Sequence, residues 1–347
     1  MFKRVLPVLT LCFLSLPAWA QADAPAAPPP AAPPAAAAVP TLEDGEAVPQ
    51  TVLVSGSRPG PGLWKVSKGE HVMWVFGTYS PLPAQMEWRS SKVERVIASS
   101  QEYLKSPGVS IEVGWGGLAA VPFLIGIKKN PDGAELKDVL PPEVYARWQP
   151  LKEKYFANDS GIERERPTFV AGELYKRALK QAGLSGGDEV RITVGKLAEK
   201  HNLKFTDATY RVAIKDPGKA AREFKKSAMD DAPCLLKTIE SLDTDVEVMR
   251  AHANAWAIGD LAEIRKLNFD DRANACVHAL STGSLGRNQP ELKTAQATSL
   301  AQWVAAAEKA LATNASTFTV VHIKEILNPK GVIATLKAKG YTVEAPK

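Results

Sequence analysis

The chain has 347 residues, 45% hydrophobic and 23% charged, which is typical of a globular protein with one sizeable domain or two small ones. Its net charge of +5 includes Lys3 and Arg4, and subtracting these two leaves +3 for the rest of the chain. So small a charge, with bases and acids mixed along the chain, excludes the basic patch of a typical nucleic-acid-binding protein. We expect no nucleic-acid partner.

The first 20 residues have the three parts of a secretory signal peptide. Lys3 and Arg4 form a basic start, residues 5–16 an apolar core, and Ala18-Trp19-Ala20 a cleavage site. The apolar core is shorter than the roughly 20 residues that a membrane-spanning helix needs, and no later stretch reaches that length. We expect cleavage near Gln21, no transmembrane segment after cleavage, and a periplasmic or secreted protein.

Residues 21–49 form the next segment, which is almost entirely alanine and proline up to about Pro40. Such a composition has little to pack and favours extended conformations, so we interpret the segment as a disordered, semi-rigid linker. The remaining residues, 50–347, are predicted to form a single domain.

A strand is predicted at His71–Phe76. The loop that follows this strand is the first candidate for a functional segment. The strand is a short run of β-branched and aromatic residues that ends in glycine and prolines. Leu63–Val66 is expected to form a β-hairpin with it. After the loop, Ser90 or Ser91 is expected to cap a helix. In α/β folds, the loop at the carboxyl end of a strand is where ligands bind.

The middle of the chain is predicted to be mostly helical, with a few short strands. The strands are expected at Val109–Val113, with Gly126–Lys129 pairing near it, and at Leu203–Thr206. The helices are expected between Pro141 and Lys200, at Pro233–Trp256 with one continuous apolar stripe, at Leu261–Leu267 after a capping box of Asp260 and Glu263, and at Leu300–Leu311.

The end of the chain repeats the strand–loop–helix form. A strand at Thr317–Ile323 is followed by a helix at Val332–Lys339, which Gly340 ends, and by a last strand at Tyr341–Glu344. This βαβ unit predicts two parallel strands. The fold class expected is α/β, mixed α and β, with a central, largely parallel sheet and a large helical insertion.

Cysteine usage agrees with export. Only Cys234 and Cys276 remain after the predicted cleavage, an even number in an oxidising compartment. They predict a structural disulfide, since a metal site needs more ligands than these two supply. Closing a loop of this length stabilises a fold by about 4 kcal/mol on the chain-entropy model.

Local motifs for catalysis are missing from the sequence. It has no His-Glu-x-x-His, no phosphate-binding glycine loop and no Gly-x-Ser-x-Gly elbow. The chain has five histidines, and no two of them have the spacing of a local metal pair. We interpret each as a partly buried, hydrogen-bonded side chain.

Several stretches together resemble the TraB/GumN family over residues 63 to 345. They are Leu63–Val66, Phe76-Gly77-Thr78 with Pro81-Leu82-Pro83, Ala134–Pro142, Ala255–Leu261 and Gly331–Val343. The family is similar to the Tiki proteases, which carry two Gly-x-x-His motifs with acidic residues between them. The resemblance therefore implies a divalent metal held where two strand ends meet, activating water for hydrolysis.

The residues at the motif positions differ from that pattern. The first motif begins at Gly77 and has Ser80 in place of histidine, and the second has His322 in place of glycine and Glu325 in place of histidine. A neutral hydroxyl is a poor zinc ligand. We therefore predict no metal, no other cofactor and no metal-dependent hydrolysis, although the fold of the family is retained.

The acidic residues expected between the motifs fall near Ser106 and Asp207. The favoured hypothesis is an exported, catalytically degenerate member of the family that acts as a binding or scaffold module for an unidentified envelope protein or polymer. The alternative is a metal-dependent hydrolase or protease with substituted ligands, which would be drawn from His71, Asp207, His322 and Glu325. We further expect the loop after the His71 strand to lie close to the turn after the His322 strand.

Overall fold

The structure is a computed structural model that describes residues 61–84, 88, 91–114, 117–186, 188–243, 246–266 and 272–346. These residues all lie within one compact unit, Ser57–Lys347. The predicted signal peptide, the linker and Ser90 lie outside the described residues. Over the residues described, none of the helices combines the length and the apolar character needed to cross a bilayer.

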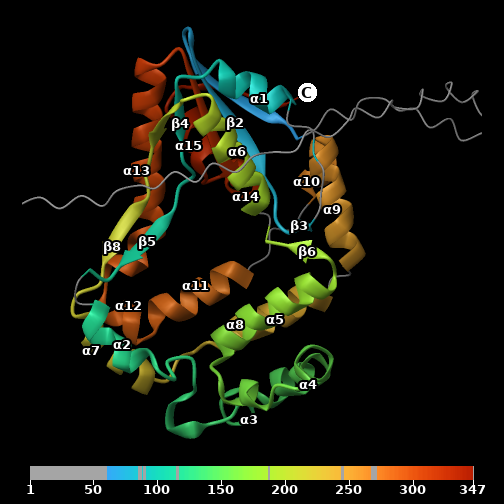
Figure 1. The fold of residues 1–347 in the computed structure, drawn as a ribbon, viewed down its shortest axis with the longest axis vertical. Helices are drawn as coiled ribbons and strands as arrows, with labels where there is room; N and C mark the ends of the chain where they lie inside the picture. Colours follow the sequence, from blue (N-terminus) through green and yellow to red (C-terminus); the bar gives the residue numbers. More distant parts are fainter. Residues whose placement is uncertain are drawn as a thin grey trace, which may run out of the picture. The chain divides into compact units, whose positions relative to one another are not determined.

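A six-stranded mixed sheet forms the centre of the fold. Its strands are β1 (Leu63–Lys68), β2 (His71–Thr78), β4 (Glu102–Leu104), β7 (Lys204–Thr206), β9 (Ser316–His322) and β10 (Thr342–Glu344). They lie in the order β10-β1-β2-β9-β4-β7, and Figure 1 labels β2 and β4 among them. The fold is α/β, as predicted.

The sheet is parallel only in part, which corrects the prediction of a largely parallel sheet. The strands β2, β9, β4 and β7 run parallel, whereas β1 is antiparallel to both of its neighbours. The reason is the predicted hairpin: Lys68 and His71 pair across a two-residue turn, and Gly69 adopts φ 59° at its first position. A left-handed glycine at this position is typical of a type II′ hairpin turn.

The strands of the predicted βαβ unit run in the same direction but are not neighbours. Strand β9 pairs with β2, and β10 pairs with β1 at the edge of the sheet. Between β9 and β10 lie two helices, α14 (Ile323–Leu327) and α15 (Val332–Ala338). Gly340 has φ 89° and follows α15, as a glycine that ends a helix does.

Helices pack against the sheet and bury its apolar side chains in one large cluster. Besides α14 and α15, they are α1 (Ser91–Ala98), α6 (Asp188–Lys200), α9 (Val246–Ile258), α10 (Leu261–Arg265) and α13 (Glu291–Thr313). The helix predicted at Leu300–Leu311 is therefore only the C-terminal half of α13. At α10 the predicted N-cap is confirmed, because the Asp260 side chain accepts a hydrogen bond from the Glu263 backbone N–H.

The predicted helical insertion has a separate hydrophobic cluster. Its helices are α3 (Leu136–Val139), α4 (Pro142–Phe156), α5 (Pro167–Gln181) and α8 (Ala232–Asp243). The 3₁₀ helices η1 (Pro131–Gly133) and η2 (Ser160–Arg164) lie beside them in the chain. Further helices are α2 (Gly117–Leu124), α7 (Pro217–Lys226), α11 (Arg272–Thr282) and α12 (Ser284–Asn288).

Two small sheets complete the described structure. In one, β3 (Leu82–Pro83) pairs with β6 (Leu184–Ser185), and in the other β5 (Val109–Glu112) is parallel to β8 (Tyr210–Ala213). The predicted pairing of Gly126–Lys129 near the Val109 strand is therefore wrong. Strand β8 takes that place, and Lys129 instead forms an isolated bridge with Glu165.

The predicted stripe helix, Pro233–Trp256, is two helices, α8 and α9. Leu235 and Ile239 belong to the cluster of the helical insertion, Met249 packs with a small third cluster, and Trp256 lies in the cluster of the sheet. Apolar spacing shows that one face of a helix is buried, but it does not show which other elements bury it. The side chains of this one stripe contribute to three different hydrophobic clusters.

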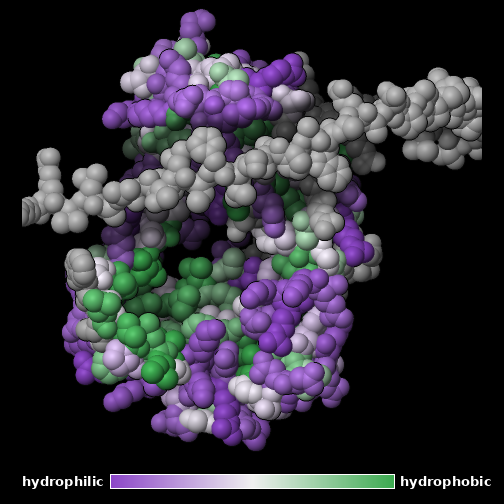
Figure 2. Space-filling view, in the orientation of Figure 1, coloured by the Kyte–Doolittle hydropathy of each residue, from purple (hydrophilic) through white to green (hydrophobic). Residues whose placement is uncertain are grey.

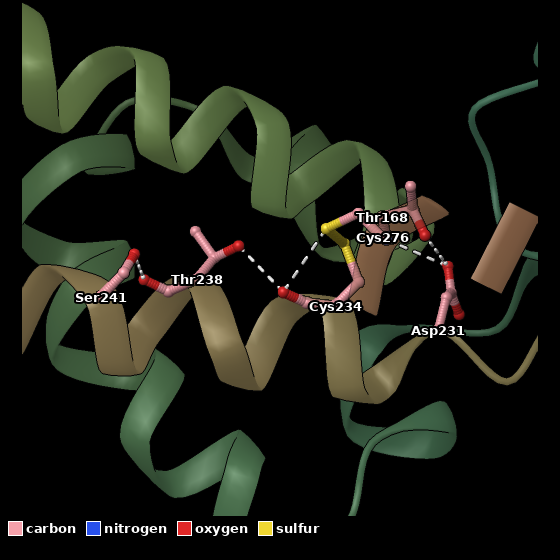
Figure 3. The surroundings of a disulfide bond; sticks show 6 residues. All are labelled: Thr168, Asp231, Cys234, Thr238, Ser241 and Cys276. Atoms are coloured by element: carbon pink, nitrogen blue, oxygen red, sulfur yellow. Dashed lines mark hydrogen bonds between the residues drawn. A yellow bond between two sulfur atoms is a disulfide. The ribbon is translucent and has the colours of Figure 1, made fainter. Parts of the chain in front are cut away.

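A disulfide joins Cys234 of α8 to Cys276 of α11, as predicted, with Cα atoms 4.5 Å apart (Figure 3). Next to it, Thr238 Oγ1 donates a hydrogen bond to the Cys234 carbonyl at 2.8 Å. The Asp231 carboxylate accepts from both the N–H and the hydroxyl of Thr168, at 3.0 and 2.9 Å. These contacts hold α8 against both α11 and α5.

Replacing both cysteines, Cys234→Ala with Cys276→Ala, is expected to lower the free energy of unfolding by up to about 4 kcal/mol, because the open chain regains loop entropy. Chemical denaturation of the oxidised proteins measures the difference. Reductant should destabilise the wild type and leave the double variant unchanged. Equal stability of the two oxidised proteins would contradict the prediction.

Candidate functional site

The candidate site lies where the parallel strands of the main sheet end. Thr78 at the end of β2 pairs in register with His322 at the end of β9. Leu104 ends β4 beside β9 and pairs with Thr206, which ends β7. The segments that follow these strands therefore start at the same edge of the sheet, where α/β folds bind ligands. This register confirms that the loop after the His71 strand and the turn after the His322 strand begin side by side.

Gly77 is required here for close packing. A Cβ atom built on it would lie 2.8 Å from Trp64 Cζ3 and 3.2 Å from Ile326 Cδ1. Its carbonyl accepts a hydrogen bond of 2.7 Å from Nε1 of the buried Trp256. Phe76, Trp88 and Trp256 form an aromatic cluster beside it, with ring centroids 5.4 to 6.2 Å apart. The first motif glycine is thus surrounded by apolar side chains.

Sequence reasoning placed Trp256 on an apolar stripe and missed its role at the strand end. The available signal was the residue type, since a buried tryptophan usually finds an acceptor for its indole N–H. No local pattern in the sequence indicates a role for Trp88. Its ring packs with those of Phe76 and Trp256, and Trp256 donates to the carbonyl of the motif glycine.

Ser80 stands at the position of the first motif histidine, and its hydroxyl holds two loops together. Ser80 Oγ donates a hydrogen bond of 2.6 Å to the carbonyl of Gly186, in the segment between β6 and α6. The adjacent strand β3 pairs with β6 in the same region. The hydroxyl proton is therefore used within the fold, and the oxygen that remains is a neutral, weak ligand.

His322, at the glycine position of the second motif, caps the short helix α14. Its Nδ1 accepts a hydrogen bond of 3.1 Å from the Lys324 backbone N–H. Burial, with a smaller effect of the Lys324 charge, lowers the pKa of His322 from 6.5 to about 4. The imidazole is therefore neutral at physiological pH, as a capping acceptor requires.

Glu325, at the histidine position of the second motif, lies partly exposed in the first turn of α14, where the helix dipole favours a negative charge. Its backbone carbonyl lies so close to Gly331 that a Cβ atom there would collide with it. The next residue, Ile326, is the one that packs toward Gly77. This turn is therefore shaped mainly by packing.

The two positions of the expected acidic residues also make structural contacts. Ser106 Oγ donates to the Val320 carbonyl at 2.7 Å and so joins the segment after β4 to β9. Asp207 accepts from the Thr209 N–H at 2.9 Å and forms ion pairs with Lys105 and Arg211, at 3.7 and 3.2 Å. Hydrogen bonds from Thr209, with smaller effects of the two cations, lower the pKa of Asp207.

His71, a ligand in the alternative hypothesis, lies at the other end of the sheet. It begins β2, whereas Thr78 and His322 lie at the far end of that strand and its neighbour. Seven steps of about 3.3 Å separate the two ends of β2 by roughly 23 Å. Among the described residues, no three His, Cys, Asp or Glu side chains come together as a metal site.

The residues at the motif positions therefore do not fit the divalent metal that the family resemblance implies. Ser80 donates its proton to Gly186, and His322 uses Nδ1 to cap α14. Asp207 is already balanced by two cations, and His71 lies at the opposite edge. We derive no chemical step through a metal from this arrangement.

Gly77→Ala is expected to lower the free energy of unfolding by about 1–3 kcal/mol, since the added methyl group overpacks a filled space. Gly195→Ala, in the middle of α6, is the matched control, because a Cβ atom there meets nothing within 4 Å. Relief of glycine entropy should stabilise that variant by about 0.5–1 kcal/mol. Urea unfolding compares the two, and equal changes would refute the packing role of Gly77.

The lowered pKa of His322 also predicts a pH dependence of stability. The unfolded chain binds a proton near pH 6.5 that the folded chain binds only near pH 4. This contribution is complete above pH 6.5 and is lost as the pH falls toward 4. His322→Asn keeps a capping acceptor but does not titrate.

The free energy of unfolding should therefore fall more steeply between pH 7 and pH 4.5 in the wild type than in His322→Asn. The expected difference is on the order of 1–3 kcal/mol. Urea denaturation at the two pH values measures it. Parallel pH profiles of the two proteins would show that His322 is not held neutral by the fold.

The model of the TraB/PrgY/gumN family matches residues 62–345, a range that includes every strand and helix described above. No curated protein and no solved structure matches the chain. The chain therefore belongs to the TraB/PrgY/gumN family.

Proposed function

We propose that this chain is an exported, catalytically degenerate member of its family that acts as a binding or scaffold module in the cell envelope. The main support is the use of the polar groups at the motif positions. Ser80 Oγ is bonded to the Gly186 carbonyl, and His322 Nδ1 to the Lys324 N–H. A catalytic metal needs about three lone-pair donors that converge and are free to bind it.

Export to the periplasm or the outside of the cell is supported by two independent features. One is the signal-peptide pattern of the first 20 residues. The other is the Cys234–Cys276 disulfide, a type of bond that forms and persists in oxidising compartments. The disulfide uses both cysteines that remain after the predicted cleavage.

The partner that we propose is an envelope protein or a polymer. Nucleic acid is disfavoured by the low net charge and the mixed bases and acids. A binding role needs only a stable surface, and the contacts around Gly77, Ser80 and His322 all act to hold the loops at the end of the sheet in place. These contacts thus hold the surrounding surface in a fixed shape that a partner can bind.

Calorimetric titration with zinc, manganese and cobalt tests the loss of metal chemistry. The protein should be taken from the exported fraction, where its amino-terminal sequence is expected to begin at Gln21. We expect no stoichiometric binding, because Ser80 and His322 form hydrogen bonds within the fold and leave too few donors for a metal. Glu143→Ala serves as a control for Glu325→Ala, since both glutamates lie in the first turn of a helix.

A one-to-one site of micromolar or tighter affinity would overturn the proposal if Glu325→Ala abolished it and Glu143→Ala did not. That result would favour a metal-dependent hydrolase with substituted ligands. A chain that retained Met1 would overturn the exported location.

A further inference from the structure

Exposed apolar side chains gather on β5, on α2 and on the residues next to them, and we call this surface the apolar patch. It follows Ser106 closely in the chain and so adjoins the segment after β4. Its side chains are between 43 and 75% exposed: Val109, Ile111, Val113, Leu118, Val121, Leu124 and Ile125. Figure 2 shows hydrophobic surface gathered at the lower left, where Figure 1 places α2 and β5. Single exposed apolar residues are ordinary, but a contiguous patch marks an interaction surface.

Helix α2 is unusual because it has no polar face. Its sequence, GLAAVPFL, contains no charged or hydrogen-bonding side chain. Such a helix is normally buried on all sides. Here it packs against α7 with Ala120 buried, while Leu118 is 70% exposed and Ile125, just after the helix, is 75% exposed. An apolar solvent or partner is needed to cover this side.

Cations border the apolar patch. The Arg222 guanidinium lies 4.9 Å from the centre of the Phe123 ring, and Lys225 Nζ donates a hydrogen bond of 2.8 Å to the Ile125 carbonyl. Lys128 and Lys129 come shortly after α2 and are exposed, with Lys128 Nζ 6.0 Å from the centre of the Phe169 ring. Two exposed acids lie close by, Asp132 and Glu112, and Glu112 forms an ion pair of 3.1 Å with Arg211 of β8. Cations therefore outnumber acids along the border of the patch, although the chain as a whole is nearly neutral.

The patch rests on a firmly packed support. The buried Arg166 donates hydrogen bonds to the carbonyls of Phe224, Lys225 and Ser227, at 2.7, 3.1 and 2.9 Å. These carbonyls lie at the C-terminal end of α7, so Arg166 anchors the helix that carries the cations. The other part of the patch, β5, is paired along its length with β8. Apolar and cationic groups are thus held on one surface.

We propose that the apolar patch docks on the surface of a bilayer that contains anionic phospholipid. The exposed side of α2 enters the boundary between headgroups and acyl chains, and the lysines and Arg222 lie against the phosphates. An apolar centre with a cationic border is complementary to such a surface. The contact is peripheral and reversible, because the apolar side chains enter only the interface. This inference goes beyond the proposed function and does not depend on whether the site binds a metal.

Co-sedimentation with vesicles tests the proposal. The exported chain, which is expected to begin at Gln21, is mixed with vesicles of phosphatidylcholine alone, or with vesicles that also contain one quarter phosphatidylglycerol. One variant removes apolar side chains, Leu118→Asn with Ile125→Asn, and a second reverses charge, Lys128→Glu with Lys129→Glu. The matched controls are Ile192→Asn, at a residue that is 53% exposed on α6, and Lys330→Glu with Lys337→Glu. Melting curves check that all variants fold.

Binding of the wild type should be at least tenfold stronger to the anionic vesicles, and should weaken as salt rises from 50 to 500 mM, because salt screens the cations. Each patch variant should lose at least tenfold in partition coefficient, and each control should stay within twofold. The proposal is overturned if the wild type does not bind, or if the patch variants bind as it does. The second result would indicate contact through another part of the chain, which all variants share.

Analytical ultracentrifugation of the same proteins tests whether a second copy of the chain covers the apolar patch instead. The bilayer proposal is overturned if the wild type self-associates, if Leu118→Asn with Ile125→Asn abolishes this association, and if no vesicle binding is found. These results would assign the patch to contact with a second copy of the chain. A wild type that binds anionic vesicles as a monomer would support it.

Discussion

The parallel pairing of β2 with β9 is the constraint on which the rest of this structure depends. It aligns Thr78 with His322 and so brings two loops, more than 200 residues apart in sequence, to one edge of the sheet. Gly77 lies within this pairing, and its missing side chain leaves room for both Trp64 and Ile326. Trp256 then closes the site by donating to the Gly77 carbonyl. The hairpin, α14 and α9 therefore all meet at one small residue.

The same constraint explains the chemistry of the strand ends. Side chains at the motif positions form hydrogen bonds with backbone groups of these loops. Ser80 donates to the Gly186 carbonyl, His322 accepts from the Lys324 N–H, and burial keeps His322 neutral so that it can accept. A hydroxyl and an imidazole nitrogen used in this way are no longer available to a metal. The motif positions thus contribute to the stability of the edge where other folds of this class bind ligands.

The helical part of the molecule is held together by contacts of its own. Its hydrophobic cluster is separate from that of the sheet, and the Cys234–Cys276 disulfide holds two of its helices together. Arg166 anchors α7, which in turn supports α2. Packing against α7 holds one side of α2, and the apolar residues on its other side stay exposed.

Several local elements of this protein follow from the sequence alone: the hairpin turn at Gly69, the cap at Asp260 and the strand–loop–helix form at both ends of the domain. Neighbouring residues produce them, because backbone preferences and hydrogen bonds act over a few positions. The disulfide follows from the cysteine number, because Cys234 and Cys276, 42 residues apart, are the two that remain after the predicted cleavage. Long-range contacts instead determine that the Pro233–Trp256 stripe contributes to three clusters, that β8 rather than Gly126–Lys129 pairs with β5, and that His71 lies far from His322. Apolar spacing reports that a side chain is buried and not which partner buries it, so these choices depend on contacts between segments that are distant in the chain.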